Sequence, residues 1–173
     1  MVLVVDFDGT LVKENSSRLL ENLLIKRTKI PGLLFLGLGK MLRYKGDFRR
    51  YMILNFFVKR HGKKNLIESM KKVAEQLTVR EQFKNKEFIV LSSGLAPIIK
   101  HTIKINNLKA LKIYASELII HDKKVKIKEL TLKDKRKILE KLVDKYHNIT
   151  YYTDDIKEAV RLKLKGVEVI CIS

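Results

Sequence analysis

The sequence predicts an α/β fold, in which a doubly wound, mainly parallel sheet carries an inserted all-helical domain. Three observations support this prediction. Short apolar runs alternate with helical patterns between residues 87 and 172, as in proteins with parallel sheets. Residues 12–80 have helical spacing throughout, and this segment is too long to be a single crossover between two strands. Finally, 46% of the 173 residues are hydrophobic, which is enough to bury a core.

The first strand is expected over residues 2–5, where an unbroken apolar run rich in valine precedes Asp6. The segment that follows is expected to form three to four helices. Ser16 and Ser17 can cap the first of them, because leucines recur behind them at helical spacing. A second helix is expected from Pro31 to Leu42, and Gly46-Asp47 can cap a third. Gly62 is expected to end the third helix, and a fourth then contains Leu66.

The second half of the chain is expected to alternate strands and helices. A strand over 88–91 ends at Ser92-Ser93-Gly94, and Pro97 stands in the first turn of the helix that follows, where its missing N–H is harmless. The remaining expected elements are a strand over 111–115, a hairpin of 118–121 with 124–128, a helix over 132–146, a strand over 149–152, a helix over 156–165 and a strand over 167–172.

The domain boundaries follow from this pattern: residues 1–11 and 81–173 form the α/β core, and residues 12–80 form the inserted helical domain. The chain has 37 Lys/Arg and 19 Asp/Glu, a net charge of +18, and the insertion holds 17 of these basic residues and 5 of the acidic ones. Such an excess favours anionic partners, such as phosphorylated metabolites, nucleic acid or anionic lipid. It is equally consistent with a lysine-rich thermophile surface.

No signal peptide is expected, because residue 1 leads directly into a short strand whose end is charged. The longest apolar window, residues 30–42, is too short to span a membrane. Cys171 is the single cysteine, so an internal disulfide is excluded, and its apolar surroundings predict a buried thiol. A soluble, cytoplasmic protein is therefore expected.

Polar side chains gather at the predicted carboxyl ends of three strands. They form two acidic pairs and one hydroxyl pair: Asp6 and Asp8, Asp154 and Asp155, and Ser92 and Ser93. Ligands of parallel α/β sheets bind at this edge, and carboxylates brought together there repel each other unless a cation lies between them. Mg²⁺ suits such a site, because it takes oxygen ligands together with substrate phosphate. The scattered histidines and the lone cysteine offer no zinc site.

Four short motifs resemble those of the haloacid dehalogenase (HAD) superfamily and occur in the same order. They are DFDGTL at 6–11, FIVLSS with Ser92, DKRKILEKL with Lys135, and YYTDDIKEA with Asp154 and either Asp155 or Glu158. The insertion after the first motif resembles the family's C1-type helical cap, in the short form found in the phosphoserine-phosphatase branch. The resemblance spans the whole chain and implies a Rossmann-like core with Mg²⁺-dependent phosphatase activity.

The resemblance also implies a role for each matched residue. Asp6 would attack phosphorus and form an aspartyl-phosphate, Asp8 would protonate the leaving alcohol and later deprotonate water, and Lys135 would offset negative charge. The phosphoryl group would be bound around Phe7, Thr10, Ser92, Ser93 and Gly94. Mg²⁺ would be held by Asp6, Asp8, Asp154 and Asp155, with Glu158 as the alternative to Asp155.

The insertion is expected to close over the site as a lid and to set substrate specificity. In phosphoserine phosphatases a cap glutamate soon after the first motif contacts the substrate amine. Here Glu14 lies nearby, but counting places Asn15 at that position, which is a departure from the pattern. Arg43, Arg49 or Arg50 can bind a second anionic group, or they form part of a solvated basic face.

We therefore expect a Mg²⁺-dependent phosphatase that acts on a phosphate monoester of a small metabolite and needs no obligate protein partner. Two alternatives stay open. One is a phosphatase for lipid or nucleic-acid phosphate ends, and the other is a catalytically silent basic module that binds nucleic acid or membrane. The silent module would give no reason to keep the acidic motifs, and the chain lacks the interleaved aromatic residues of a single-strand binder.

Overall fold

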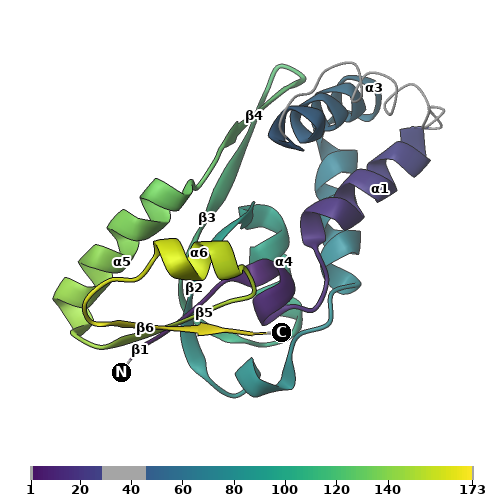
Figure 1. The fold of residues 1–173 in the computed structure, drawn as a ribbon. Helices are drawn as coiled ribbons and strands as arrows, with labels where there is room; N and C mark the ends of the chain where they lie inside the picture. The colour runs from purple at the N-terminus through teal and green to yellow at the C-terminus, as the bar shows by residue number, and fades with distance from the viewer. Residues whose placement is uncertain (1, 29–45, 173) are drawn as a thin grey trace.

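The computed structural model describes residues 2–28 and 46–172, which form a six-stranded sheet with helices on both faces (Figure 1). The strand order is β4-β3-β2-β1-β5-β6, and all neighbouring strands are parallel except β3 and β4. The strands are β1 (Val2–Val5), β2 (Glu87–Leu95), β3 (Lys109–His121), β4 (Lys124–Lys128), β5 (Ile149–Thr153) and β6 (Val167–Cys171). The mainly parallel α/β fold predicted from the sequence is confirmed.

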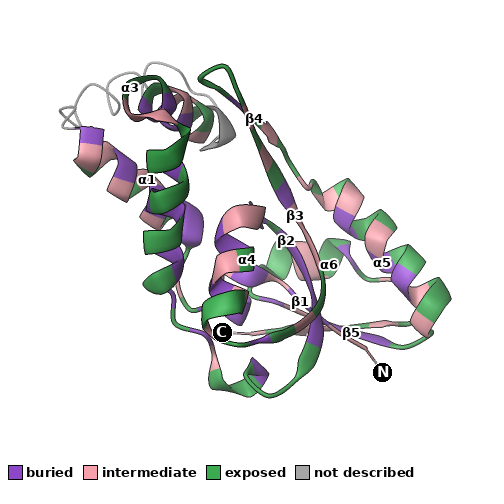
Figure 2. Ribbon diagram, turned by 180° about the vertical axis from the view of Figure 1, so that it is seen from behind, coloured by how far each residue is buried: buried purple, intermediate pink, exposed green. Residues whose placement is uncertain are grey.

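Helices cover the sheet on both faces because successive strand residues point to opposite sides. On one side Val4 packs in a buried cluster with residues of α5 (Leu132–Tyr146), next to α6 (Ile156–Arg161). On the other side Val5 belongs to a second cluster, which includes residues of α4 (Ala96–Ile105) and of the helical insertion. The buried residues, purple in Figure 2, line these two interfaces. β1 therefore runs through the centre of the core.

Two helices of the insertion are described, α1 (Ser16–Thr28) and α3 (Gly46–Glu75). Gly62 interrupts α3 with φ 81° and ψ 166°, backbone angles that only glycine adopts readily, so the predicted break between two helices is confirmed. The helix expected over 31–42 and the side chain of Arg43 lie outside the described residues. Whether residues 12–80 form a separate domain stays a prediction.

The insertion joins the core through two chain segments that lie side by side. Val12 and Val79 form an isolated antiparallel bridge. Beside it the Lys13 N–H donates to the Thr78 carbonyl at 3.0 Å, and the Glu14 carboxylate accepts from the Thr78 N–H at 2.8 Å. Both connections to the insertion are therefore held together next to the carboxyl end of β1.

Several elements differ from the sequence expectation. β2 does not end at Ser92 but continues to Leu95, with irregular pairing to β3 over its last residues. The expected strand over 111–115 and the first arm of the hairpin form one continuous strand, β3. Its first part pairs with β2 and its second part pairs with β4, without a break between them. α6 ends at Arg161 rather than near residue 165, and the Leu162 side chain that follows is fully buried.

Cys171 is exposed, contrary to the prediction of a buried thiol. The reason is its place at the end of β6, which is an edge strand of the sheet. In the part of the chain that the structure describes, no helix has the length and apolar character needed to cross a membrane.

The β3–β4 hairpin contacts the insertion through one side-chain amide. Asn55 of α3 accepts from the Val125 N–H at 2.8 Å and donates to the Val125 carbonyl at 3.2 Å. Val125 is fully buried although β4 is an edge strand. The Asn55 amide thus pairs with the strand edge as a neighbouring strand would, and it holds α3 against the hairpin.

We expect Asn55→Ala to lower the free energy of unfolding by about 1–3 kcal/mol, because it leaves the buried N–H and C=O of Val125 without partners. Chemical denaturation followed by circular dichroism measures this. Asn65→Ala is the matched control, since the exposed Asn65 amide donates only to the His61 carbonyl within the same helix. An equal loss in both variants would contradict the proposed role of the Asn55 contact.

Candidate active site

A cavity of about 540 Å³ lies at the carboxyl ends of the central strands, where the core meets the insertion. The core lines it with the turn after β1, the last residues of β2, the loop after β5 and Lys135 from α5. The insertion lines it with Lys13, Asn15, Ser17 and Arg50. Acidic and basic side chains therefore share one concave site, which is within the size range of small-molecule pockets.

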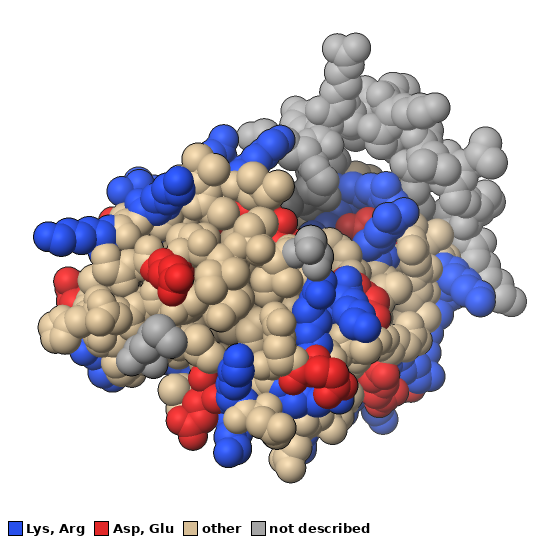
Figure 3. All heavy atoms as spheres, turned by 60° about the horizontal axis from the view of Figure 1, so that its bottom comes forward, with Lys and Arg blue, Asp and Glu red and all other residues tan. Residues whose placement is uncertain are grey.

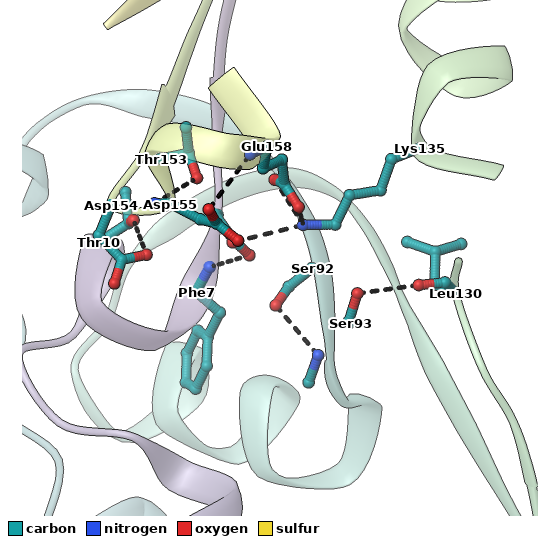
Figure 4. Close-up of polar contacts among 12 residues, drawn as sticks. Phe7, Thr10, Ser92, Ser93, Leu130, Lys135, Thr153, Asp154, Asp155 and Glu158 are labelled. Carbon is teal, nitrogen blue, oxygen red and sulfur yellow. Dashed lines mark hydrogen bonds and ion pairs between the residues drawn. The ribbon is translucent and has the colours of Figure 1, made fainter. Parts of the chain in front are cut away.

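Asp6 is the first residue after β1, and its carboxylate is held on two sides. Its Oδ1 accepts from the Phe7 N–H at 2.7 Å, and its Oδ2 lies 3.3 Å from the Lys135 amine (Figure 4). The following turn, Phe7–Leu11, is closed by a bond of 3.1 Å from the Leu11 N–H to the Asp6 carbonyl. The strand end and this turn together point the Asp6 carboxylate into the cavity.

Gly9 lets a second carboxylate approach this turn. Its φ is +71°, and a Cβ at this position would lie 2.0 Å from Asp154 Oδ2. Asp154 follows β5, and its other oxygen accepts from the Thr10 hydroxyl at 3.2 Å. Any side chain at residue 9 would displace the Asp154 carboxylate, so glycine is required both by the backbone angle and by the close approach. Thr10 is fully buried, and its hydroxyl binds Asp154 rather than facing the cavity as a phosphate ligand would.

Asp8 faces the insertion rather than Asp6. Its Oδ1 accepts from the Ser16 N–H, at the start of α1, at 2.8 Å. Burial raises the pKa of the Asp8 carboxyl above its usual value, and the nearby Asp6 charge adds to this. The Ser16 hydrogen bonds and the Arg50 charge act in the opposite direction. Asp8 is thus a half-buried carboxyl with an increased tendency to hold a proton.

The end of β2 contributes hydroxyl and N–H groups. The buried Ser92 hydroxyl accepts from the Gly94 N–H at 3.1 Å, which leaves its own proton able to bind an anion. The Ser93 hydroxyl instead donates to the Leu130 carbonyl at 2.9 Å. The buried Ser116 hydroxyl donates to the Ser93 carbonyl and accepts from the Leu130 N–H, so the β2 end is tied to the loop before α5.

Lys135 is the cationic centre of the site. Its side chain is 1% exposed, whereas Lys133 and Lys137, its neighbours on α5, are exposed. Its amine donates to both Glu158 oxygens at 2.8 and 2.9 Å and lies 3.4 Å from the Tyr151 hydroxyl. Together with Asp6 these partners compensate a charge that burial alone would make very costly.

Two of the acidic residues after β5, Asp155 and Glu158, make different contacts. Asp155 Oδ1 accepts from the Lys157 and Glu158 N–H groups and so caps α6. Glu158, one turn into α6, binds Lys135. Asp6, Asp8, Asp154 and Asp155 all line the cavity, but Asp155 is engaged as a helix cap, and their role as a metal-binding set stays a prediction.

A Mg²⁺ ion would have to be bound by fewer protein carboxylates than the sequence suggested. Within residues 2–28 and 46–172, no group of three or more His, Cys, Asp or Glu side chains is arranged to hold a metal. Asp6 and Asp154 both line the cavity, and the missing side chain at Gly9 leaves room for the Asp154 carboxylate beside the β1 turn. These donors fit Mg²⁺, because that ion is commonly held by one or two carboxylates and completes its shell with water and substrate phosphate.

On the insertion side, the residues compared with the phosphoserine-phosphatase pattern have structural partners. Glu14 binds the Thr78 N–H, and the Asn15 side chain accepts from the Arg18 N–H at the start of α1. Arg49 and Arg50 both approach Glu21, at 3.4 and 3.9 Å, and Arg50 also lines the cavity. Of Arg49 and Arg50, therefore, Arg50 is the one that lines the cavity.

Two residues important to this geometry were not predicted as site residues. Tyr151 reads from the sequence as a core residue of a strand, and nothing local shows that its hydroxyl meets Lys135. Ser116 lies within β3 and gives no motif signal. Glu158 was predicted only as an alternative metal ligand. It lies three residues after Asp155, the N-cap of α6, and its carboxylate contacts the Lys135 amine.

Solved structures with the same fold were found by structural comparison. A HAD-family hydrolase from Salmonella enterica serovar Typhi superposes with a TM-score of 0.58 and 13% identity, covering 93% of this chain and 58% of its own. A phosphoserine phosphatase, solved as an analogue of its phospho-aspartyl intermediate, gives 0.56 and 18%, covering 93% and 80%. A probable phosphoserine phosphatase from Vibrio cholerae gives 0.64 and 11%, covering 98% and 56%.

The chain thus has the fold of HAD-family hydrolases and phosphoserine phosphatases, as its motifs predicted, and it spans just over half of the Salmonella hydrolase. No protein-family model and no curated protein sequence matches it. Since the identities are below 20%, the likeness concerns the fold, and the chemistry must be argued from the site itself.

We expect Lys135→Met to lower the free energy of unfolding by about 3 kcal/mol, because it leaves the Asp6 and Glu158 carboxylates buried without their cation. Urea denaturation in a metal-free buffer at neutral pH measures this. Lys137→Met, the same change on the exposed face of α5, should alter stability by no more than about 0.5 kcal/mol. Unchanged stability of Lys135→Met would show that the buried amine is not needed to balance these charges.

Proposed function

We propose that this protein is a Mg²⁺-dependent phosphatase of the HAD superfamily, which hydrolyses the phosphate monoester of a small metabolite through an aspartyl-phosphate. The observation that carries the proposal is the Asp6 carboxylate, which lies between the Phe7 N–H and the buried Lys135 amine and lines the cavity at the end of the central strand. The likeness in fold to a phosphoserine phosphatase supports it. The cavity volume supports a small substrate.

Asp6 would act as the nucleophile. One of its oxygens forms a bond to phosphorus while the bond between phosphorus and the ester oxygen breaks, and the alcohol leaves. Lys135 stabilises the ionised form of Asp6 and the negative charge that gathers on the phosphoryl oxygens. Water then attacks the aspartyl-phosphate, which releases phosphate and restores Asp6.

Asp8 would act as the general acid and then as the general base. Its protonated form donates to the leaving oxygen, and the resulting carboxylate accepts the proton of the attacking water. Its hydrogen bond from the Ser16 N–H links this carboxyl to α1, at the edge of the insertion. The partly enclosed position of Asp8, where burial and the nearby Asp6 charge raise its pKa, suits a group that must exchange protons during the cycle.

The phosphoryl group would be held by the β2 end and by the turn after β1. The Ser92 hydroxyl accepts from the Gly94 N–H and so has its own proton available, and Ser92, Ser93 and Gly94 line the same cavity. Asp6 and Asp154 would hold the Mg²⁺ ion. When bound, that ion would neutralise negative charge on the carboxylate and the phosphoryl oxygens.

The insertion would act as a lid, since it supplies one wall of the cavity and joins the core through two adjacent segments. Phosphatase activity on lipid or nucleic-acid phosphate ends, and silent binding, are less well supported. On the face that Figure 3 shows, lysine and arginine side chains lie in separate groups with acidic side chains among them. A silent module would also give no reason for the Asp6 carboxylate to line the cavity beside the Lys135 amine.

We expect the protein to release phosphate from an aryl phosphate only when Mg²⁺ is present, and Asp6→Asn to reduce this release at least about 10³-fold, because the nucleophile is lost. Phosphate release measured with Mg²⁺ and with excess chelator tests both points. Asp144→Asn, on the exposed face of α5, should keep wild-type activity. Activity of Asp6→Asn equal to that of the wild type would refute Asp6 as the nucleophile.

A second test uses the contact between Gly9 and Asp154. Gly9→Ala should abolish most activity, because its Cβ would push Asp154 away from the cavity. Gly62→Ala should keep activity although it also introduces a side chain at positive φ, since no atom lies within 4 Å of that Cβ. Both variants should lose about 1–3 kcal/mol of stability from backbone strain. Full activity of a folded Gly9→Ala variant would contradict the role given to Asp154.

A further inference from the structure

Below the Asp6–Lys135 pair lies a buried phenol that the proposed mechanism does not use. Tyr151 is in the middle of β5, fully buried, and its hydroxyl is within hydrogen-bonding distance of both Lys135 and Glu158. The lysine donates to the phenol oxygen at 3.4 Å, and the phenol donates to Glu158 Oε1 through a short contact. Lys135, Glu158 and Tyr151 therefore form a closed ring of hydrogen bonds.

This ring of hydrogen bonds restricts the directions in which the N–H groups of the Lys135 amine can point. An ammonium group has three N–H donors and rotates freely unless its partners fix it. Glu158 and Tyr151 engage the amine from the side of β5 and α6, and Asp6 Oδ2 lies 3.3 Å from it on the cavity side. Four oxygens thus surround three N–H donors, because both Glu158 oxygens contact the amine. When the two Glu158 oxygens share one donor and Tyr151 accepts the second, the third is directed toward Asp6 and the cavity.

The phenol is suited to this task because it stays protonated. Burial raises the pKa of Tyr151 well above its usual value, and the nearby Asp6 and Glu158 charges raise it further. It is therefore a neutral donor that holds one Glu158 oxygen without adding charge to a crowded acidic site. A phenylalanine would fill the same space but would remove both the hydrogen bond that the phenol donates to Glu158 and the one that it accepts from Lys135.

We propose that Tyr151 is a positioning residue: by holding Glu158 and accepting from Lys135, it orients the lysine amine toward Asp6. This role rests on the proposed phosphatase function, because it concerns the group that stabilises Asp6 and the phosphoryl oxygens. Tyr151 itself touches neither.

The test compares Tyr151→Phe with Tyr152→Phe, the same substitution on the next residue of β5. Tyr152 points to the opposite face of the sheet, where its ring packs edge-on against Phe83 with centroids 5.5 Å apart. With an aryl phosphate and Mg²⁺, Tyr151→Phe should lower kcat about 10- to 100-fold, the effect of a lost hydrogen bond to a charged group, and leave KM within about twofold. Tyr152→Phe should leave both constants within about twofold of the wild type.

A double-mutant cycle with Glu158→Gln separates positioning from packing. If Tyr151 acts through Glu158, Tyr151→Phe should lower kcat much less in the Glu158→Gln background than in the wild type. Glu158→Gln alone should reproduce the loss of kcat with little change in KM, so it also serves if Tyr151→Phe does not fold. Urea unfolding of each variant verifies that the compared proteins are folded.

Two results would overturn the inference while the proposed function stands: an active wild type with unchanged kcat in Tyr151→Phe, or independent effects of the two substitutions in the cycle. A wild type that releases no phosphate from a panel of phosphate esters would overturn the proposed function, and this role with it.

Discussion

The structure of this site depends on one buried cation. Lys135 is almost without solvent contact, and a charge in that position is tolerated only when carboxylates surround it. Asp6 from the end of β1 and Glu158 from α6 provide this compensation, and the Tyr151 hydroxyl joins them. Because these residues come from β1, α5, β5 and α6, the balance of charge also fixes how the elements meet at the carboxyl edge of the sheet. The arrangement expected to make Asp6 reactive is thus part of what holds the core together at this edge.

At the carboxyl edge of the sheet, glycine, serine and threonine residues allow the loops after neighbouring strands to approach each other closely. Gly9 leaves the space that the Asp154 carboxylate fills, and the Thr10 hydroxyl holds that carboxylate in place. On the opposite side, Ser116 ties the end of β2 to the loop before α5, which carries Lys135 on its following helix. The Asp154 carboxylate, the end of β2 and the loop before α5 are therefore fixed by hydrogen bonds from hydroxyl groups at this edge.

The insertion contacts the site at Asp8, the residue proposed to transfer protons. Asp8, the proposed acid, accepts from the first turn of α1, and Glu14 fastens the two linkers beside it. Farther away, the Asn55 amide fixes α3 to the β3–β4 hairpin. A movement of the insertion would change both the enclosure of the cavity and the surroundings of Asp8. In the proposed function, the position of the insertion and the acid–base role of Asp8 would thus be linked through the hydrogen bond from the Ser16 N–H to the Asp8 carboxylate.

The sequence by itself determined those features that depend on local pattern. Apolar runs placed β1, β5 and β6, helical spacing gave α5 its bounds, and the positive φ at Gly62 matches the break predicted there. The motifs also pointed to Asp6, Ser92, Lys135 and Asp154, all of which line the cavity. For Asp6 and Asp154 the reason is that residues following parallel strands fall on a common edge of the sheet. Only the tertiary structure decided which side chains and strands pair with one another. Asp155 caps a helix while Glu158 binds the lysine, Tyr151 turns its hydroxyl into the site, and β3 runs unbroken from one partner strand to the next. Local periodicity specifies which face a side chain occupies, but a hydrogen-bond partner is set by the distance between segments far apart in the chain, and that distance exists only once they have packed.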